Sequence, residues 1–143
     1  MPSEPLFRKV DAVEIAVPSV DDGLAFYRDR LGHKLVWRTE TSAGLRMPGT
    51  DAELVLQTER PESGVDLLVE SADAAVDAIV AAGGRVVAAP FDIAIGRCAV
   101  VEDPWGNRLV VLDARNGRLE TDEEGRVIGL TPPADEGPSS SGG

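Results

Sequence analysis

Hydrophobic and polar residues alternate near the start of the chain, and alternation with a period of two predicts a strand that has one buried face. One face of this strand carries the larger aliphatic side chains, Val13, Ile15 and Val17. The other face carries Ala12, Glu14 and Ala16. Seven further runs rich in aliphatic residues also predict strands, at residues 33–38, 43–47, 52–57, 65–69, 85–89, 97–102 and 108–112.

Two segments between these runs repeat their hydrophobic residues at helical spacing instead. The first stripe consists of Val20, Leu24, Tyr27 and Leu31, and the second of Ala72, Val76, Ile79 and Val80. Ser19 and Ser71 stand where a side-chain oxygen accepts hydrogen bonds from the first turn of a helix. Gly32 and the pair Gly83–Gly84 supply the left-handed conformation that ends a helix. We therefore expect two helices whose stripes face a sheet.

The two halves of the chain repeat each other at an offset of 52 residues. Residues 13–17 align with residues 65–69, Ser19 aligns with Ser71, and Gly32 aligns with Gly84. Each half is then a strand, a helix and three strands. The predicted fold class is therefore α+β, a single domain of two tandem βαβββ modules at residues 8–58 and 65–113, with a linker at 59–64.

The segments outside the two modules have patterns of their own. Residues 1–7 are expected to form an N-terminal arm. The runs 118–121 and 126–129 flank an acidic turn, which predicts a hairpin within an extension at 114–130, placed to latch onto a partner subunit. Residues 131–143 contain prolines and a closing run of serine and glycine with almost nothing to bury, so we expect a disordered tail.

The charge balance argues against some partners. The 143 residues contain 14 Lys and Arg against 25 Asp and Glu, a net charge of −11, and such a surface repels phosphate backbones. We therefore expect no nucleic-acid partner and favour a cationic or neutral small molecule. No apolar run approaches the roughly 20 residues of a membrane span, and the N-terminus lacks the pattern of a signal peptide. The expectation is a cytoplasmic protein with no membrane contact.

Two short motifs on this repeated scaffold carry a family resemblance. The sequence FYRDRLG at residues 26–32 spans the end of the first predicted helix, and DPWGN at residues 103–107 precedes the last predicted strand. With the βαβββ repeat, these motifs resemble the vicinal oxygen chelate superfamily, which includes glyoxalase I, bleomycin-resistance proteins and extradiol dioxygenases. The resemblance implies a curled, cup-shaped mixed sheet with the helices outside, a small molecule in the cup, and a homodimer.

The resemblance also implies where a metal would be bound. Metal-binding members use a His or Gln from the first strand of a module and a Glu from its last strand. These positions fall on Ala12, Val55, Gly64 and Val110, none of which can bind a divalent ion. We therefore expect no cofactor at the usual centre, which argues against glyoxalase I and iron-dependent dioxygenase chemistry. A divalent metal at another site stays open.

Two carboxylates related by the repeat are the main site candidates. Glu14 and Asp66 lie two residues beyond the vacant first-strand positions, on the same strand face. If both first strands line one cup, both carboxylates point into it, and a buried carboxylate is costly unless it is paired, hydrogen-bonded or protonated. They could bind a cationic group, act as general acid and base, or hold an ion at an unusual site. Alternatively, both lie near strand edges in water or bond to neighbouring backbone.

Four other residues are candidates for contacting a ligand. Gln57 and Arg108 lie on the predicted cup face and could orient it, although Arg108 could equally be a rim residue paired with an acid. Trp37 and Trp105 could wall the cavity by stacking on an apolar or aromatic molecule, with Trp105 at the edge of the cup.

The single histidine and the single cysteine add little. His33 follows the glycine that ends the first helix, and a lone histidine is a poor basis for a catalytic or metal site. Cys98 lies in a predicted strand with no obvious partner base, so we expect a small core residue.

The predicted function is metal-independent binding of a small cationic or aromatic compound, as in the bleomycin-resistance branch, where sequestration confers antibiotic resistance. Glu14 and Asp66 attract a cation in this interpretation, and the tryptophans and aliphatic residues supply burial. The alternative is a lyase or isomerase of the same superfamily. Glu14 and Asp66 would then transfer protons or act as atypical metal ligands.

Overall fold

The computed structural model describes residues 4–131. The first half of the chain contains strands β1 (Lys9–Ala16), β2 (Lys34–Arg38), β3 (Ser42–Arg46) and β4 (Glu53–Gln57). The second half contains β5 (Gly64–Leu68), β6 (Arg85–Ile93), β7 (Gly96–Glu102) and β8 (Arg108–Leu112). The helices are α1 (Val20–Leu24), its π-helical continuation η1 (Ala25–Arg30), and α2 (Ala72–Ala81). A hairpin of β9 (Arg118–Thr121) and β10 (Val127–Thr131) follows.

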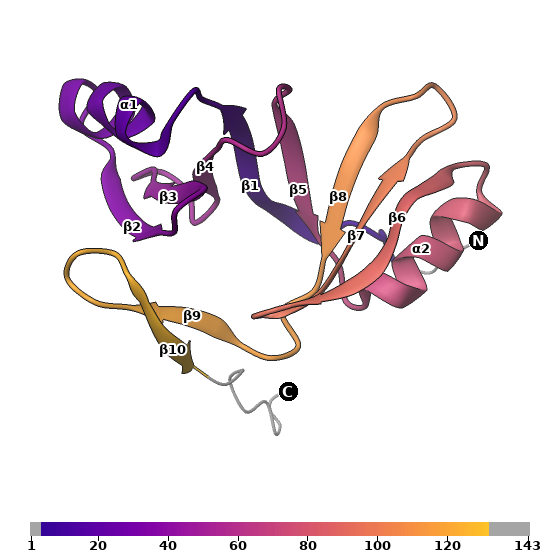
Figure 1. Ribbon diagram of the computed structural model, residues 1–143. Helices are drawn as coiled ribbons and strands as arrows, with labels where there is room; N and C mark the ends of the chain where they lie inside the picture. Colours follow the sequence, from indigo (N-terminus) through magenta and orange to yellow (C-terminus); the bar gives the residue numbers. More distant parts are fainter. Residues whose placement is uncertain (1–3, 132–143) are drawn as a thin grey trace.

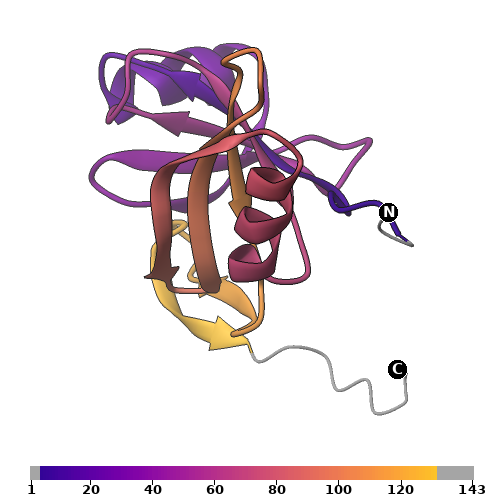
Figure 2. The same cartoon turned by 90° about the vertical axis from the view of Figure 1, so that its right-hand side faces the viewer.

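Eight strands form one curled, unclosed mixed sheet in the spatial order β2-β3-β4-β1-β5-β8-β7-β6 (Figure 1). The first strands of the two modules, β1 and β5, pair antiparallel at its centre. Each also pairs in parallel with the last strand of its own module, β4 or β8. The helices lie on the outer side of the sheet (Figures 1 and 2). The predicted α+β fold of two tandem βαβββ modules is confirmed, and one chain builds the whole cup.

Each helix packs on its own half of the sheet. Beneath α1 the buried cluster consists of Val20, Leu24, Ala43, Leu45 and Leu56. Beneath α2 it consists of Val69, Ala75, Val76, Ala99, Val101 and Val111. No helix among residues 4–131 is long and apolar enough to cross a membrane. Burial of these outward-facing side chains leaves the opposite, concave side of the sheet free for a site.

Two residues assigned to the helical stripes do not face the sheet. Leu31 is 53% exposed and Val80 is 48% exposed, so their predicted burial is wrong. Leu31 follows the π-helical segment, whose wider turn rotates later side chains away from the stripe. Val80 comes directly after the half-buried Ile79, and one helical residue turns the side chain by about 100°.

The predicted helix ends are confirmed. Ser19 Oγ accepts a hydrogen bond from the Asp22 amide at 2.9 Å, and Ser71 Oγ accepts one from the Ala74 amide at 3.1 Å. Gly32 has a φ of 87° after the first helical segment, and of the Gly83–Gly84 pair it is Gly83 that adopts the left-handed conformation, with a φ of 111°. These caps satisfy backbone groups that a helix by itself leaves unpaired.

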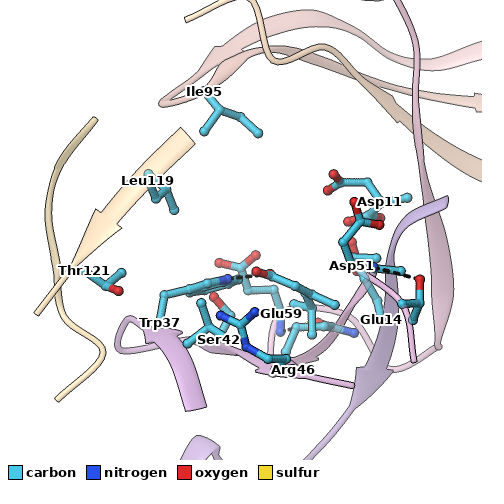
Figure 3. Close-up of a pocket in the computed structure, with 18 of the residues that line it drawn as sticks. Asp11, Glu14, Trp37, Ser42, Arg46, Asp51, Glu59, Ile95, Leu119 and Thr121 are labelled. Atoms are coloured by element: carbon cyan, nitrogen blue, oxygen red, sulfur yellow. Dashed lines mark hydrogen bonds between the residues drawn. The ribbon is translucent and has the colours of Figure 1, made fainter. Parts of the chain in front are cut away.

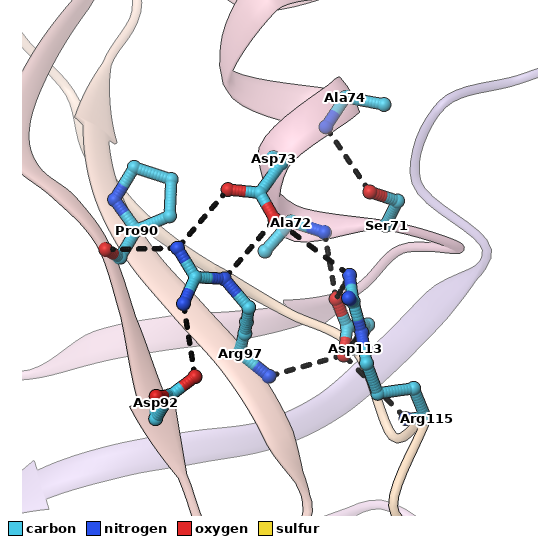
Figure 4. A network of polar contacts seen from close by, with 9 residues as sticks. All are labelled: Ser71, Ala72, Asp73, Ala74, Pro90, Asp92, Arg97, Asp113 and Arg115. Atoms are coloured by element: carbon cyan, nitrogen blue, oxygen red, sulfur yellow. Dashed lines mark hydrogen bonds and ion pairs between the residues drawn. The ribbon is translucent and has the colours of Figure 1, made fainter.

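One buried carboxylate ties the N-terminus of α2 to the strands beneath it (Figure 4). Asp113 is 1% exposed and accepts hydrogen bonds from the Ala72 amide at 2.8 Å and the Arg97 amide at 3.0 Å. The guanidinium of Arg115 adds hydrogen bonds at 3.0 and 2.8 Å. Burial by itself would raise the pKa of Asp113, but the hydrogen bonds from Arg115 and the two amides outweigh it and lower that pKa. Helix and sheet are therefore joined at this point.

The predicted hairpin forms, and it packs against its own chain. The Arg38 amide of β2 donates a hydrogen bond to the Gly125 carbonyl at 2.7 Å. Gly125 lies against Leu35 and Trp37 so closely that a Cβ there would meet Leu35 at 3.1 Å. The hairpin thus lies over the concave side of its own sheet (Figure 1). That it also latches onto a partner subunit stays a prediction. Thr131 of the predicted tail belongs to β10, and residues 132–143 lie outside the described residues.

Candidate functional site

The concave side of the sheet holds a cavity of about 510 Å³, bounded on one side by the β9–β10 hairpin (Figure 3). Its lining residues are Asp11, Ala12, Glu14, Val36, Trp37, Ser42, Arg46, Thr50, Asp51, Ala52, Glu53, Val55, Gln57, Glu59, Arg60, Asp66, Ile95, Leu119 and Thr121. The first module and β5 supply most of them, and Leu119 and Thr121 come from the hairpin. A cavity of this size suits a small organic molecule.

The lining of this cavity is strongly acidic. Of the lining residues that the structure describes, six are carboxylic acids, Asp11, Glu14, Asp51, Glu53, Glu59 and Asp66, and two are arginines, Arg46 and Arg60. Low-dielectric walls strengthen the field of such groups inside a cleft. The cavity therefore favours a positively charged group over a negatively charged one.

Asp66 lies in the middle of β5, and its pKa is strongly raised. Its cross-strand neighbours are Ala12 on β1 and Val110 on β8, neither of which can hydrogen-bond through its side chain. Its Oδ1 is buried and finds no hydrogen-bond partner within residues 4–131. Burial and then the charge of Asp11 raise the pKa of Asp66 from 3.8 to about 7, against the opposing effect of Arg60. At neutral pH this carboxyl group therefore gains and loses a proton readily.

Glu14 shares the cavity with Asp66 and has a cationic partner. It is 8% exposed and forms an ion pair with Arg60 from the linker between the modules. Its cross-strand neighbours are Val55 on β4 and Gly64 on β5. Glu14 and Asp66 thus line one cavity, on the strand face to which the alternation assigned them.

Gln57 supports the linker that carries Arg60. Its Nε2 donates to the carbonyls of Arg60 and Glu62 at 3.0 and 3.2 Å. Its Oε1 accepts from the amides of Glu59 and Arg60, both at 2.8 Å. These four hydrogen bonds use both amide hydrogens and both acceptor sites of the side chain. Gln57 is therefore a positioning residue for Arg60, and it also lines the cavity, so its contact with a ligand stays a prediction.

Trp37 forms one wall of the cavity (Figure 3). Its indole Nε1 donates a hydrogen bond to Glu53 Oε1 at 2.7 Å. The ring lies directly over Gly44 of β3, where a Cβ would come within 2.0 Å of Nε1. Only glycine permits this approach, so β3 holds the indole flat against the sheet. Trp37 offers the cavity an aromatic surface beside a carboxylate.

Two candidates do not reach this cavity. Trp105 is 82% exposed in the turn before β8 and does not line it, so the prediction that Trp105 walls the cavity is wrong. Arg108 lines a second, smaller cavity, and its guanidinium lies 3.6 Å from Glu62 and 3.7 Å from Glu102. This is the rim position paired with acids that was the other interpretation of Arg108.

His33 and Cys98 have no place in the acidic cavity. His33 directly precedes β2, and its Nδ1 lies 3.1 Å from the carbonyl oxygen of Arg46 at the end of β3. Cys98 is a buried, free thiol. Burial, followed by the charge of Asp66, raises the pKa of Cys98 to about 11, so the thiol stays protonated at neutral pH.

Asp11 lines the cavity although the period of two assigned it to the opposite face of β1. The pairing of β1 with β5 shifts register between Val10 and Ala12, and Asp11 lies at this β-bulge. A bulge inserts an extra residue, so it redirects a side chain that strict alternation would place outside. Arg60 was likewise missed because its segment has no periodic pattern. The pairing of strands and the folding of the linker bring both residues to the site.

Residues 9–111, more than half of the chain, match the sequence model of the Glyoxalase/Bleomycin resistance protein/Dioxygenase superfamily. The chain belongs to this superfamily. An uncharacterized protein of Mycolicibacterium smegmatis is 32% identical over 106 residues, which are 71% of this chain and 90% of that protein.

Solved structures of other proteins share the fold of this chain. Methylmalonyl-CoA epimerase from Mycobacterium tuberculosis has a TM-score of 0.66 at 21% identity, over 79% of this chain and 92% of that chain. Homoprotocatechuate 2,3-dioxygenase from Brevibacterium fuscum has a TM-score of 0.55 at 22% identity, over 79% of this chain and 39% of that chain. At such identities the likeness establishes the architecture alone.

The residues present do not fit the metal centre that the superfamily resemblance implies. Ala12 and Val110 pair with Asp66, while Val55 and Gly64 pair with Glu14, so each carboxylate lies between two positions that lack donor atoms. Within residues 4–131, no group of three or more His, Cys, Asp or Glu side chains is arranged to hold an ion. Beside the positions of the expected ligands the cup offers the carboxyl groups of Glu14 and Asp66 and the guanidinium of Arg60, which is paired with Glu14.

Proposed function

We propose that this protein binds a small organic cation in the acidic cup and sequesters it without chemical change. The single observation that carries the proposal is the excess of carboxylic acids over arginines around a cavity of about 510 Å³. Glu14 and Asp66 supply negative charge at the floor, and Trp37 supplies an aromatic wall on which a cation or a flat ring can lie.

The charge of the cup also selects against other ligands. A coenzyme A thioester, the substrate type in the name of the mycobacterial epimerase, carries several phosphate charges. Six carboxylic acids around the cavity oppose such a polyanion, and the two arginines do not balance them. The proposal therefore separates the ligand of this chain from that of its structural relative.

Three further features belong to the proposal. Binding is metal-independent, because the positions that would hold a metal carry no donors. The protein acts in the cytoplasm as a homodimer. Its benefit to the cell is resistance to a toxic cationic compound, such as an antibiotic, because a bound compound cannot reach its target.

The charge preference is directly measurable with three benzyl probes: benzyltrimethylammonium, neutral benzyl alcohol and anionic phenylacetate. Their quenching of Trp37 fluorescence is recorded in a Trp105→Phe background, so that Trp37 is the only tryptophan left. We expect binding of the ammonium ion at least tenfold tighter than of the alcohol, and no binding of phenylacetate. Glu14→Gln should weaken ammonium binding about tenfold, because it removes a negative charge from the cavity. A tenfold change corresponds to about 1.4 kcal/mol.

Asp77→Asn is the matched control, because it removes an exposed carboxylate on α2 that does not line the cup. Equal affinity for all three benzyl probes, or tighter binding of phenylacetate, would refute cation binding. An ammonium affinity that Glu14→Gln and Asp77→Asn lower by the same factor would assign the effect to net charge and remove Glu14 from the site.

One observation favours a second candidate function, that of an isomerase or lyase. Asp66 has a buried oxygen without a hydrogen-bond partner within residues 4–131, and its pKa of about 7 is in the range in which a general base and its conjugate acid are both available. In this candidate, Asp66 removes a proton from carbon next to a carbonyl group, and Arg60 stabilises the negative charge that forms on the carbonyl oxygen. The proton then returns to the carbon or exchanges with solvent.

Proton transfer depends on geometry more steeply than binding does. Incubation with small α-hydroxy- and α-aminoketones in D₂O, followed by NMR, should show deuterium at the α-carbon if Asp66 is a base. Asp66→Glu should then reduce exchange at least a hundredfold, while a pure binder should keep its ammonium affinity within a few fold. Absence of exchange above the protein-free rate for every ketone would eliminate the second candidate.

A further inference from the structure

The pairing register places one row of side chains across the sheet from β3 to β6. Residues opposite each other on neighbouring strands share a face, and the row runs Arg46, Glu53, Ala12, Asp66, Val110, Val100, Ala88. On the first-module side of Asp66 the row contains charged groups, and on the other side it contains only aliphatic ones. Asp66 therefore marks a sharp boundary on the concave surface.

The aliphatic side of this row has a cavity of its own, with a volume of about 110 Å³. Its lining residues are Arg60, Glu62, Ser63, Gly64, Val65, Val87, Ala88, Val100, Arg108 and Val110. The charges here are already paired, because Arg60 contacts Glu14 and Arg108 contacts Glu62 and Glu102. The interior therefore attracts an uncharged apolar group, since nothing in it compensates the burial of a charge.

The two cavities adjoin at Arg60, which lines both of them. Beside it, Gly64 pairs with Glu14 of the acidic cavity and lines the aliphatic one. A Cβ built on Gly64 meets nothing within 4 Å, so the space next to Glu14 is open in the direction of the second cavity. One ligand can therefore reach from the acidic cup into the aliphatic cavity.

We infer that the ligand is bipartite: a cationic head in the acidic cup and a short aliphatic arm that passes Gly64 into the aliphatic cavity. The inference rests on the proposed function, because the head is the cation proposed above. A water molecule takes up roughly 30 Å³ in the liquid, and a methylene group is of similar size, so about 110 Å³ holds an arm of about four carbons. The occupant is thus an amphipathic cation, and a compact or uniformly polar one fills only one of the two cavities.

The test is a series of alkyltrimethylammonium ions with arms from methyl to hexyl, titrated into the full chain by calorimetry. Burial of each methylene contributes about 0.8 kcal/mol, so affinity should rise about fourfold for each carbon up to butyl and then level off. Gly64→Val narrows the passage without backbone strain and should abolish the increase in affinity with arm length. Gly49→Val is the matched control, because its Cβ also meets nothing within 4 Å and Gly49 lines neither cavity.

A second variant keeps the test informative if Gly64→Val does not fold. Ala88→Val partly fills the aliphatic cavity from β6, and it should shorten the rise by one to two carbons and raise the melting temperature, since a void is filled. If affinity increases over the same number of carbons in the wild type and all three variants, the inference is overturned and cation binding remains intact. A flat series in the wild type would also overturn it. If no ammonium ion binds, or if Glu14→Gln leaves tetramethylammonium binding unchanged, the proposed function fails and the inference with it.

Discussion

Asp66→Asn should make the protein more stable at pH 8 and leave its stability almost unchanged at pH 4. The native pKa of about 7 lies about three units above the usual 3.8, because burial and the charge of Asp11 penalise the ionised form. Each unit corresponds to about 1.4 kcal/mol, so ionised Asp66 destabilises the native state by up to about 4 kcal/mol. Asparagine keeps the shape and removes the charge. Urea unfolding of both proteins across this pH range measures the difference.

The sign of this effect distinguishes Asp66 from an ordinary carboxylate. Between pH 4 and pH 7 the native state holds the Asp66 proton more tightly than the unfolded state, so the free energy of unfolding falls as pH rises. Above pH 7 both states are ionised and the contribution is constant. Asp77→Asn on the exposed side of α2 controls for the loss of one surface charge. A difference between wild type and Asp66→Asn that is equal at pH 4 and pH 8 would contradict a buried, proton-holding Asp66.

The same substitution tests the link between stability and ligand. An ionised Asp66 is costly in the free protein, and a bound cation offsets that cost. Ammonium affinity should therefore rise with pH through about 7 in the wild type and lose that rise in Asp66→Asn. Groups that destabilise a fold but serve its ligand are common at binding sites.

Asp113→Ala should destabilise the protein by about 3 kcal/mol or more. The substitution leaves the amides of Ala72 and Arg97 without their acceptor, and each unsatisfied buried group costs about 1–3 kcal/mol. It also removes the link between α2 and the strands that Figure 4 shows. Thermal or urea unfolding at pH 7 gives the change.

Asp92→Ala is the control for Asp113→Ala. Asp92 is 85% exposed and also contacts Arg97, at 2.9 Å, so its removal deletes an arginine partner without orphaning a buried amide. Its effect should stay within about 1 kcal/mol, as for other exposed ion pairs. Equal effects of the two substitutions would show that the buried anchor contributes nothing of its own.

The two buried acids also give opposite pH dependences. The pKa of Asp113 is lowered in the native state, so its contribution is present in full above the unfolded value of about 3.8 and is lost as pH falls through the native pKa. Asp66 acts in the other direction between pH 4 and pH 7. Together they place the greatest stability on the acidic side of neutrality.

Much of the fold was predictable because its signals are local. The aliphatic alternation of β1, the N-caps Ser19 and Ser71 and the left-handed Gly32 each reflect geometry within a few residues. The offset repeat then supplied the tandem modules without any tertiary information. The same alternation assigned Glu14 and Asp66 to one strand face, which is the face that lines the cup.

The sequence did not reveal side-chain partners and burial that depend on contacts between distant residues. Gln57 lies on the predicted face and lines the cup, but the sequence did not show that the linker folds back on it and uses its hydrogen bonds. Trp105 belongs to a motif that is visible in the sequence, yet the turn that carries it projects into solvent. Leu31 stands at helical spacing in the sequence, but it is exposed because the segment before it is π-helical, which periodicity does not reveal.

The sequence by itself determined the α+β class, the two modules, the helix ends and the carboxylates of the central strands, because backbone geometry and side-chain spacing act over short distances. Only the tertiary structure decided that Asp11 turns inward at a bulge, that Arg60 reaches Glu14, and that Asp66 holds its proton near neutral pH. The reason is physical: burial, ion pairing and pKa depend on groups that pairing between remote strands brings together. The same pairing created the boundary at Asp66 between the charged and aliphatic halves of the cup.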